Sequence, residues 1–191
     1  MDSGSAARPR APFGEFEQVG WAREDDRLLP RVAAALAALP AGDEVFYVDT
    51  DPGKADTAAF CEAYGVGLDV SANCVVVAAK RAQETTLAGC VVLATTRLDV
   101  NKAVRKRLGA RKASFAPMDT AVELTGMEYG GITPAGLPED WPLLVDAAVA
   151  ATPYVLIGSG RRRGKLILPG AALTRLPGAE VVDGLGLPIL D

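Results

Sequence analysis

The loop at residues 125–138 has the most unusual composition in the chain and reads TGMEYGGITPAGLP. Four glycines and two prolines fall within these fourteen residues. Gly130 and Gly131 carry no Cβ, so their backbone N–H groups can turn outward, and Pro134 then fixes the direction in which the chain leaves. Amides presented in this way can hold a carboxylate, a phosphate or the oxyanion of a tetrahedral ester intermediate. A tight surface loop without a ligand explains these residues equally well.

Three other hydroxyl or carboxylate groups lie in or after this loop. Thr133 adds a hydroxyl group to the loop itself. Asp146 ends an apolar segment, and its carboxylate could orient a water or an ammonium group, or could cap a helical turn at 147–150. Ser159 stands between two glycines in a predicted tight turn, and we do not expect it to be a nucleophile because it lacks the usual base.

The chain contains no histidine. This absence excludes Ser-His-Asp and Cys-His nucleophile systems, imidazole general bases and most zinc sites. The glycine-rich loop also lacks the GxxxxGK[ST] pattern of a phosphate-binding P-loop. Any catalysis must therefore use carboxylates, lysines, hydroxyls, backbone amides or groups of the substrate, and the sequence predicts no metal site and no cofactor.

The cysteines and the apolar segments indicate where the protein works. Cys61, Cys74 and Cys90 lie in apolar segments without CxxC spacing, which predicts reduced, buried side chains rather than catalytic ones. The N-terminal residues lack the apolar core of a secretory signal, and the longest apolar stretch, 32–41, is too short to span a bilayer. We therefore expect a cytoplasmic protein without membrane contact.

Basic residues are concentrated in two segments, although the formal net charge is −4. Residues 101–112 contain six Lys and Arg and no acidic residue, and residues 161–165 contain four more. Such clusters can neutralise the phosphates of a nucleic acid. A solvated helix face and a basic turn would explain the same charges without a partner.

The apolar periodicity and the turn residues predict a mixture of helices and strands. Helices are predicted at 24–39, 54–65, 100–108, 119–126 and 169–176, and strands at 44–49, 72–79, 90–95, 112–116, 142–146, 154–158 and 165–168. We expect a disordered tail at 1–20 and the end of the ordered part at 180–184. Because the elements do not alternate strictly, the predicted fold class is α+β, with one domain whose antiparallel or mixed sheet is closed on itself.

Three segments, LTGMEYGGITPAGLP, LLVDAAV and YVLIGSGRRRGKLIL, resemble the YbaK/ProX family. This family comprises bacterial trans-editing factors and the insertion domain of bacterial prolyl-tRNA synthetases. The similarity runs from about residue 44 to residue 183, and the glycine loop is its most specific part. The resemblance implies a single domain at 21–191 with a mixed, mostly antiparallel, barrel-like sheet flanked by helices. It also implies a deacylase that hydrolyses the ester between a wrong amino acid and the 3′-terminal adenosine of a tRNA, with an aminoacyl-tRNA synthetase as a further candidate partner.

The resemblance also implies a site, because a GxxxP loop, here Gly130 to Pro134, borders the aminoacyl pocket of that family. The residues that would act on the ester are Gly130, Gly131, Thr133 and Asn73. The residues that would contact the substrate are Ile132, Pro134, Asp146, Gly158, Ser159 and Gly160. Phosphates of the tRNA would be bound by Lys102, Arg105, Lys106 and Arg161.

Asn73 departs from the family pattern, since it occupies the position of a functional lysine in a motif of the type K-[TS]-L-V. An amide can form hydrogen bonds but offers no charge to an oxyanion or a phosphate. Lys80 lies on the opposite face of a regular strand and about 23 Å further along it, so we expect it to be a solvated residue. Two alternatives remain: a deacylase with a modified pocket, or a non-catalytic module of the same fold that binds the tRNA acceptor end or a small ligand.

Overall fold

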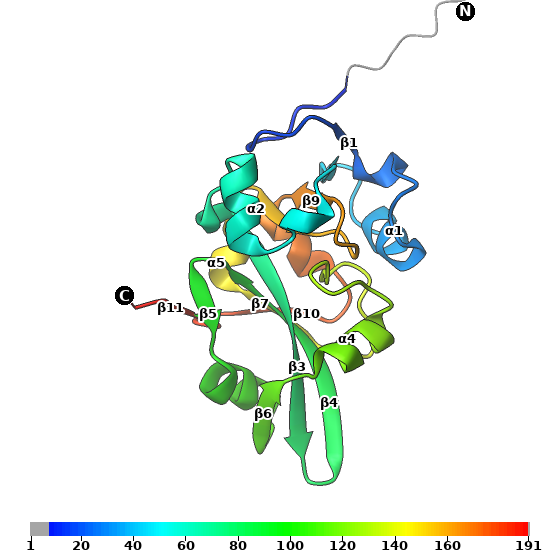
Figure 1. Ribbon diagram of the computed structural model, residues 1–191. Coiled ribbons are helices and arrows are strands. Elements are labelled where there is room, and N and C mark those ends of the chain that lie inside the picture. The colour runs from blue at the N-terminus through cyan, green and yellow to red at the C-terminus, as the bar shows by residue number, and fades with distance from the viewer. Residues whose placement is uncertain (1–7, 191) are drawn as a thin grey trace, which may run out of the picture.

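The strands of residues 8–190, the part of the chain that this computed structural model describes, form three sheets (Figure 1). An antiparallel sheet has the order β1 (Val19–Trp21), β2 (Phe46–Val48), β9 (Lys165–Leu168) and β8 (Val155–Gly158). A mixed sheet has the order β10 (Ala179–Val182), β7 (Leu143–Asp146), β4 (Glu84–Leu93), β3 (Ala72–Arg81) and β6 (Lys112–Phe115). The third sheet pairs β5 (Thr96–Leu98) with β11 (Gly186–Pro188).

This arrangement confirms the predicted α+β fold class but corrects the barrel-like sheet. Within residues 8–190, a single bridge joins the antiparallel and the mixed sheet, between Ser71, just before β3, and Leu156 of β8. Beyond that bridge the two sheets diverge, and the pocket described below opens between them. The sheets therefore stay open instead of closing on themselves.

The helices of the described chain differ from the predicted ones: those predicted at 24–39 and 54–65 are shorter, and the segment predicted at 169–176 is a 3₁₀ turn. The helices are α1 (Pro30–Ala37), α2 (Thr57–Tyr64), α3 (Arg105–Arg107), α4 (Met118–Thr125) and α5 (Ala147–Ala150), with 3₁₀ turns η1 (Ala22–Glu24), η2 (Pro52–Lys54), η3 (Leu68–Val70) and η5 (Gly170–Arg175) and a π-helical segment η4 (Val100–Val104). Left-handed Gly65 and Gly126 end α2 and α4 as predicted, with φ of 61° and 67°. Helix α4 begins at Met118, one residue before the predicted start at 119, with Pro117 as its N-cap. Within residues 8–190, none of the helices has both the length and the apolar composition needed to cross a membrane.

The hairpin of β3 and β4 is longer than predicted. The two strands pair over ten residues each, from Ala72 opposite Leu93 to Arg81 opposite Glu84. Residues 84–89, which precede the strand predicted at 90–95, also belong to β4, because Thr85 and Thr86 are β-branched and pair with the end of β3. Lys80 lies exposed opposite Thr85, far from the start of the strand, as the sequence predicts.

Both ends of the described chain are packed more extensively than the sequence indicates. Residues 1–7 of the predicted tail lie outside the described residues, but Phe16 stacks on Tyr64 with ring centroids 5.5 Å apart. At the other end, Leu185 is fully buried and β11 pairs with β5. The ordered part therefore continues past residue 184, which corrects that prediction.

The glycine-rich loop 125–138 packs closely on the end of β8. Gly160 N donates a hydrogen bond to Gly131 O at 2.8 Å, and Gly131 N donates to Glu128 O at 3.0 Å. A Cβ at Gly158 would lie 2.6 Å from Gly131 O, and a Cβ at Gly131 would lie 2.3 Å from Arg161 O. Glycine at these positions thus allows two backbones to approach where side chains would collide.

A Gly158→Ala substitution should therefore force the loop away from β8. We expect it to lower the free energy of unfolding by about 1–3 kcal/mol, the usual cost of overpacking. The matched control is Gly42→Ala, because a Cβ at Gly42 meets no atom within 4 Å. Urea unfolding of both variants gives the comparison, and equal stabilities of the two would contradict the close packing.

Candidate functional site

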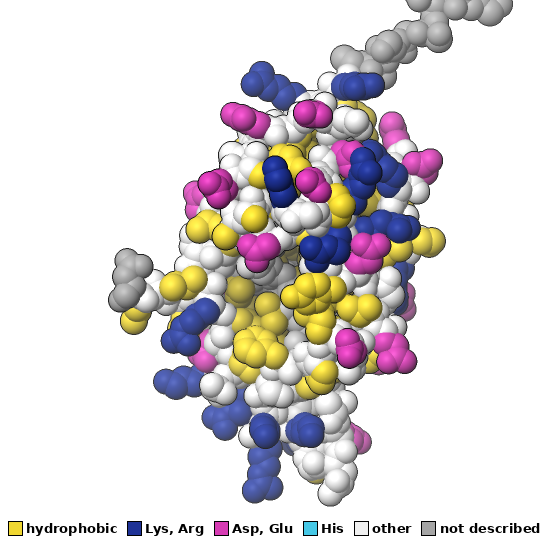
Figure 2. Space-filling model, viewed as in Figure 1, with side chains coloured by type: hydrophobic (Ala, Val, Ile, Leu, Met, Phe, Trp, Pro, Cys, Tyr) yellow, Lys and Arg dark blue, Asp and Glu magenta, His cyan; other side chains and the backbone are white. Residues whose placement is uncertain are grey.

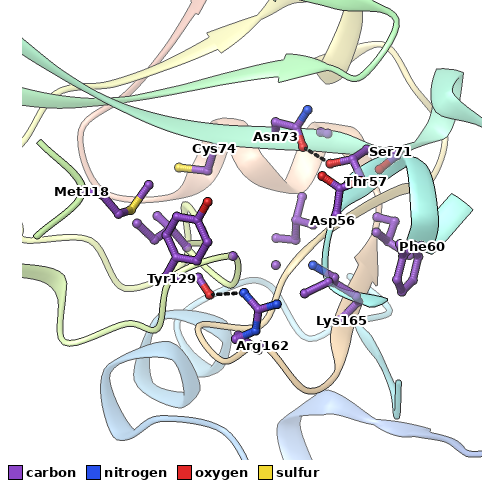
Figure 3. A pocket seen from close by; sticks show the side chains of 17 residues that line it. Asp56, Thr57, Phe60, Ser71, Asn73, Cys74, Met118, Tyr129, Arg162 and Lys165 are labelled. Atoms are coloured by element: carbon purple, nitrogen blue, oxygen red, sulfur yellow. Dashed lines mark hydrogen bonds between the residues drawn. The ribbon is translucent and has the colours of Figure 1, made fainter. Parts of the chain in front are cut away.

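A pocket of about 310 Å³ lies where the two larger sheets diverge (Figure 3). Its wall is contributed by the N-terminal half of α2, the start of β3, the end of β8, the first residue of β9 and the glycine-rich loop. The lining residues that carry polar or sulfur-containing side chains are Asp56, Thr57, Ser71, Asn73, Cys74, Met118, Tyr129, Arg162 and Lys165. Segments far apart in the sequence therefore converge on one cavity.

Asn73 lies on the pocket wall at the start of β3. Its Oδ1 accepts a hydrogen bond from the Thr57 hydroxyl at 3.0 Å. The Asp56 carboxylate, which accepts from the amides of Ala58 and Ala59, caps α2 and so fixes the position of Thr57. With its oxygen engaged in this way, the Asn73 side chain can still donate through Nδ2.

Lys165 is a pocket residue that the sequence analysis missed. Its side chain belongs to β9, the residue is only 7% exposed, and Nζ lies 5.5 Å from the Phe60 ring centroid. Among residues 8–190, no carboxylate oxygen lies within 4.0 Å of Nζ. Burial, reinforced by the neighbouring Arg162 cation and opposed by Cys61, lowers the pKa of Lys165 below its usual 10.5.

The burial of Lys165 is costly for the fold. Burying an ammonium group that has no anionic partner costs a protein roughly several kcal/mol of folding free energy. A cation–π contact of the kind made with Phe60 returns only about 1–2 kcal/mol. The contacts within the described chain therefore do not offset the desolvation of this side chain. In the sequence, Lys165 opens an apolar strand directly after a basic turn, a position typical of a solvated charge.

Arg162 ties the glycine-rich loop to the turn between β8 and β9. Its guanidinium donates to Tyr129 O and Pro52 O, both at 3.2 Å, and its amide donates to a Glu128 carboxylate oxygen at 2.9 Å. Arg161 points elsewhere, donating to Arg27 O at 3.0 Å. Of the two arginines, Arg162 alone therefore lines the pocket.

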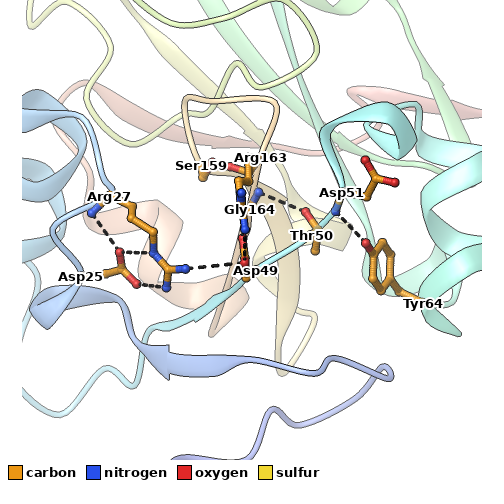
Figure 4. A network of polar contacts seen from close by, with 9 residues as sticks. All are labelled: Asp25, Arg27, Asp49, Thr50, Asp51, Tyr64, Ser159, Arg163 and Gly164. Atoms are coloured by element: carbon orange, nitrogen blue, oxygen red, sulfur yellow. Dashed lines mark hydrogen bonds and ion pairs between the residues drawn. The ribbon is translucent and has the colours of Figure 1, made fainter.

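A group of charged side chains that do not line the pocket holds this turn in place (Figure 4). Both Asp49 carboxylate oxygens accept from the Arg163 guanidinium at 2.7 Å, and Arg27 lies 3.7 Å from Asp49. The hydrogen bonds from Arg163, which outweigh the effect of burial, lower the pKa of Asp49 below its usual 3.8. Gly164 N also donates to the Thr50 hydroxyl at 3.0 Å, so the turn is fixed directly before Lys165.

Only some of the other residues predicted to contact the substrate line the pocket. Gly130, Ile132 and Gly158 line it. No described residue accepts a hydrogen bond from the amides of Gly130 or Ile132, whereas the Gly131 amide already donates to Glu128. Five buried residues do not line the pocket: Gly131, Thr133, Pro134, Ser159 and Gly160. The Thr133 hydroxyl has no hydrogen-bond partner within the described residues.

Asp146 and Ser159 have structural contacts that explain their polarity. Asp146 accepts from Ala148 N at 3.1 Å, which caps α5, and from Gly186 N at 2.6 Å. Ser159 Oγ donates within its own turn, towards Arg161 O or Arg163 O. Both side chains lie outside the pocket lining.

The pocket thiol and the other cysteines are poor nucleophiles. Burial raises the pKa of Cys74, which lines the pocket, to about 12. Burial also raises the pKa of Cys61 and Cys90. The thiols therefore stay protonated near neutral pH, in agreement with their predicted role as small apolar side chains.

The predicted tRNA-binding residues of the basic helix are accessible. Lys102, on η4, and Arg105 and Lys106, on α3, are all exposed. Lys and Arg side chains gather at the end of the molecule that carries β6 and the tip of the β3–β4 hairpin (Figure 2). Arg107 on the same helix is paired with Glu180.

Comparison with known proteins shows what this chain resembles. The family model described as the aminoacyl-tRNA editing domain matches residues 51–176. A solved structure of a candidate trans-editing enzyme for prolyl tRNA synthetase is 24% identical, with a TM-score of 0.67 over 82% of this chain and 97% of that one. Hypothetical protein APE2540 is 22% identical, with a TM-score of 0.68 over 82% of this chain and 99% of the other. These likenesses in structure establish a shared fold.

The ion pairs of Asp49 should make the free energy of unfolding depend on pH in the acidic range. Because its pKa is lowered on folding, the contribution of Asp49 is fully present above about pH 4 and is lost as the pH falls through the lowered value. We expect Asp49→Asn to be less stable than wild type at pH 7 and closer to wild type at pH 3. The control Asp69→Asn changes an exposed carboxylate, and urea unfolding at both pH values measures the difference. A stability difference that does not change with pH would rule out this role.

Proposed function

Because the chain belongs to the aminoacyl-tRNA editing domain family, we propose that it hydrolyses the ester of a mischarged tRNA. The observation that carries this proposal is the convergence of Asn73, Lys165 and the Gly130 amide on one pocket of about 310 Å³. The substrate end would be the aminoacyl group on the 3′-terminal adenosine. The reaction needs no imidazole, in keeping with a chain that contains none.

The chemistry demands little of the protein. A water oxygen bonds to the ester carbonyl carbon, the bond from that carbon to the ribose oxygen breaks, and the ribose oxygen takes up a proton. The neighbouring ribose hydroxyl already activates the ester, so positioning and stabilisation of the oxyanion suffice. The amides of Gly130 and Ile132 can donate to the oxyanion, and Asn73 Nδ2 can donate to the substrate. Thr133 and Gly131 would act by shaping the loop.

The tRNA itself would be bound through its phosphates. The exposed side chains of Lys102, Arg105 and Lys106 lie on one basic segment, and phosphate contacts dominate the affinity of proteins for nucleic acids. Arg161 is a weaker candidate, because it donates to Arg27 O and lies 3.9 Å from Glu128. The protein would then act in the cytoplasm, alone or beside an aminoacyl-tRNA synthetase.

A non-catalytic module that binds the acceptor end or a small ligand is the second candidate. The observation in its favour is Asn73, whose oxygen is held by Thr57 and whose side chain carries no charge. If the family lysine were indispensable for hydrolysis, a pocket with this amide would bind its ligand without turnover.

Release of amino acid from a panel of mischarged tRNAs distinguishes the two candidates. We expect wild type to hydrolyse at least one substrate faster than buffer does, and Asn73→Ala to lower that rate about tenfold, the loss of roughly one hydrogen bond in the transition state. The control Gln18→Ala removes an exposed amide outside this pocket and outside the basic segments. Binding without turnover would support the second candidate, and no tRNA affinity even at low salt would contradict both.

Neutralising the basic helix should weaken tRNA binding. We expect Lys102→Gln/Arg105→Gln/Lys106→Gln to lower the affinity and to reduce the slope of log K against log salt by roughly 0.7–0.9 for each phosphate that is no longer neutralised. Arg8→Gln/Arg10→Gln, which removes exposed charges elsewhere, is the control. Fluorescence anisotropy with labelled tRNA at several salt concentrations provides the slopes, and an unchanged slope for the triple variant would exclude this surface.

A further inference from the structure

The buried ammonium of Lys165 is aimed into the pocket and has no anionic partner in the described chain. The residue is 7% exposed, and its side chain reaches the cavity from β9, across from the start of β3 (Figure 3). The aromatic ring of Phe60 lies beside the ammonium group, with its centroid 5.5 Å from Nζ. A charge held in this way is free to bind an oxygen of an incoming ligand.

The charged groups around Lys165 explain why it stays unpaired. At the start of α2, the Asp56 carboxylate also lines the pocket, where its Oδ1 accepts from two helix amides, but among the described residues no oxygen of it lies within 4.0 Å of Lys165 Nζ. From the turn before β9, the Arg162 guanidinium adds a like charge. Cys61, also on α2, is the remaining titratable neighbour, and burial raises its pKa. The pocket therefore offers a positive charge with no described carboxylate within ion-pair distance of it.

We propose that Lys165 contacts the substrate ester in this pocket and provides the positive charge that a lysine at the position of Asn73 would otherwise supply. This inference rests on the proposed function. Both residues line the same cavity but come from different sheets, so either position can present a side chain to one ligand. Two ammonium groups in so small a cavity would repel each other, and the uncharged amide at Asn73 is compatible with a lysine at position 165.

The test compares Lys165→Met with wild type and with the control Lys80→Met, which removes an exposed lysine at the far end of β3. We expect Lys165→Met to lower the rate of amino acid release at least tenfold while its melting temperature stays equal to wild type or rises. Loss of activity without loss of stability distinguishes a ligand contact from a structural role, because methionine fills the same space without the unpaired charge. Lys80→Met should change neither quantity.

A second lysine position provides a rescue experiment. In the double variant Lys165→Met/Asn73→Lys, the charge returns to the pocket from β3, and we expect part of the lost rate to return. The single variant Asn73→Lys should gain little or lose activity, because it places two like charges together. The proposal would be overturned if Lys165→Met released amino acid as fast as wild type. It would also be overturned if the double variant were as stable as wild type but recovered none of the lost rate.

Binding separates failure of this inference from failure of the proposed function. The probes are adenosine derivatives that carry different amino acids through a non-hydrolysable 3′-amide, titrated against wild type, Lys165→Met and Lys80→Met. We expect a dissociation constant at least tenfold higher for Lys165→Met alone. If wild type binds the probes in this way but hydrolyses no tRNA, only the catalytic proposal fails. If no probe distinguishes Lys165→Met from wild type, the contact is excluded.

The pH dependence of stability gives an independent check on the burial of Lys165. Because its pKa is lowered on folding, its charge penalises the folded state below that lowered value, and the penalty disappears as the pH rises towards 10.5. The stability advantage of Lys165→Met should therefore shrink as the pH approaches 10.5. An advantage that is constant over this range, or a destabilised variant, would contradict the buried charge on which the inference depends.

Discussion

The close approach of two backbones at Gly131 and Gly158 is the constraint on which the site depends. The glycine-rich loop lies against the end of β8 because neither residue carries a Cβ, and the hydrogen bond from Gly160 N to Gly131 O fixes their registry. That contact places Gly130 and Ile132 on the pocket wall and positions the turn that leads into β9. The Asp49–Arg163 ion pair and the hydrogen bond from Gly164 N to the Thr50 hydroxyl also hold this turn in place.

The contacts that fix the loop and the turn also determine the electrostatic character of the pocket. Lys165 is the first residue of β9, so every contact that fixes the turn also fixes the direction of its side chain. Lys165 is buried yet has no carboxylate within 4.0 Å of its ammonium group among the described residues, and no described residue accepts from the amides of Gly130 and Ile132 at the pocket edge. Such a cavity is suited to an oxygen that gains negative charge, as the carbonyl oxygen of an ester does during hydrolysis.

Much of this structure was predictable from sequence, and the exceptions have physical reasons. The glycine-rich loop and the exposed place of Lys80 at the far end of β3 follow from local residue types and from strand periodicity, which depend on few neighbours. The place of Asn73 in the site followed from the resemblance to the editing family. Asp146 and Ser159 were harder to interpret because a capping carboxylate and a turn hydroxyl look the same in sequence as ligand-binding groups. Lys165 was missed because burial is a property of the assembled sheets. The open sheets escaped prediction since a single bridge, Ser71 to Leu156, decides how they meet.

The central claim is that this pocket hydrolyses an aminoacyl ester with the help of the buried Lys165 charge. The most direct measurement is the single-turnover rate of amino acid release from a mischarged tRNA, with protein in excess, for wild type and for Lys165→Met at equal folded concentration. The account predicts release by wild type well above the rate in buffer and a loss of at least tenfold in the variant, about 1.4 kcal/mol or more in the barrier. Equal rates for the two proteins would contradict it.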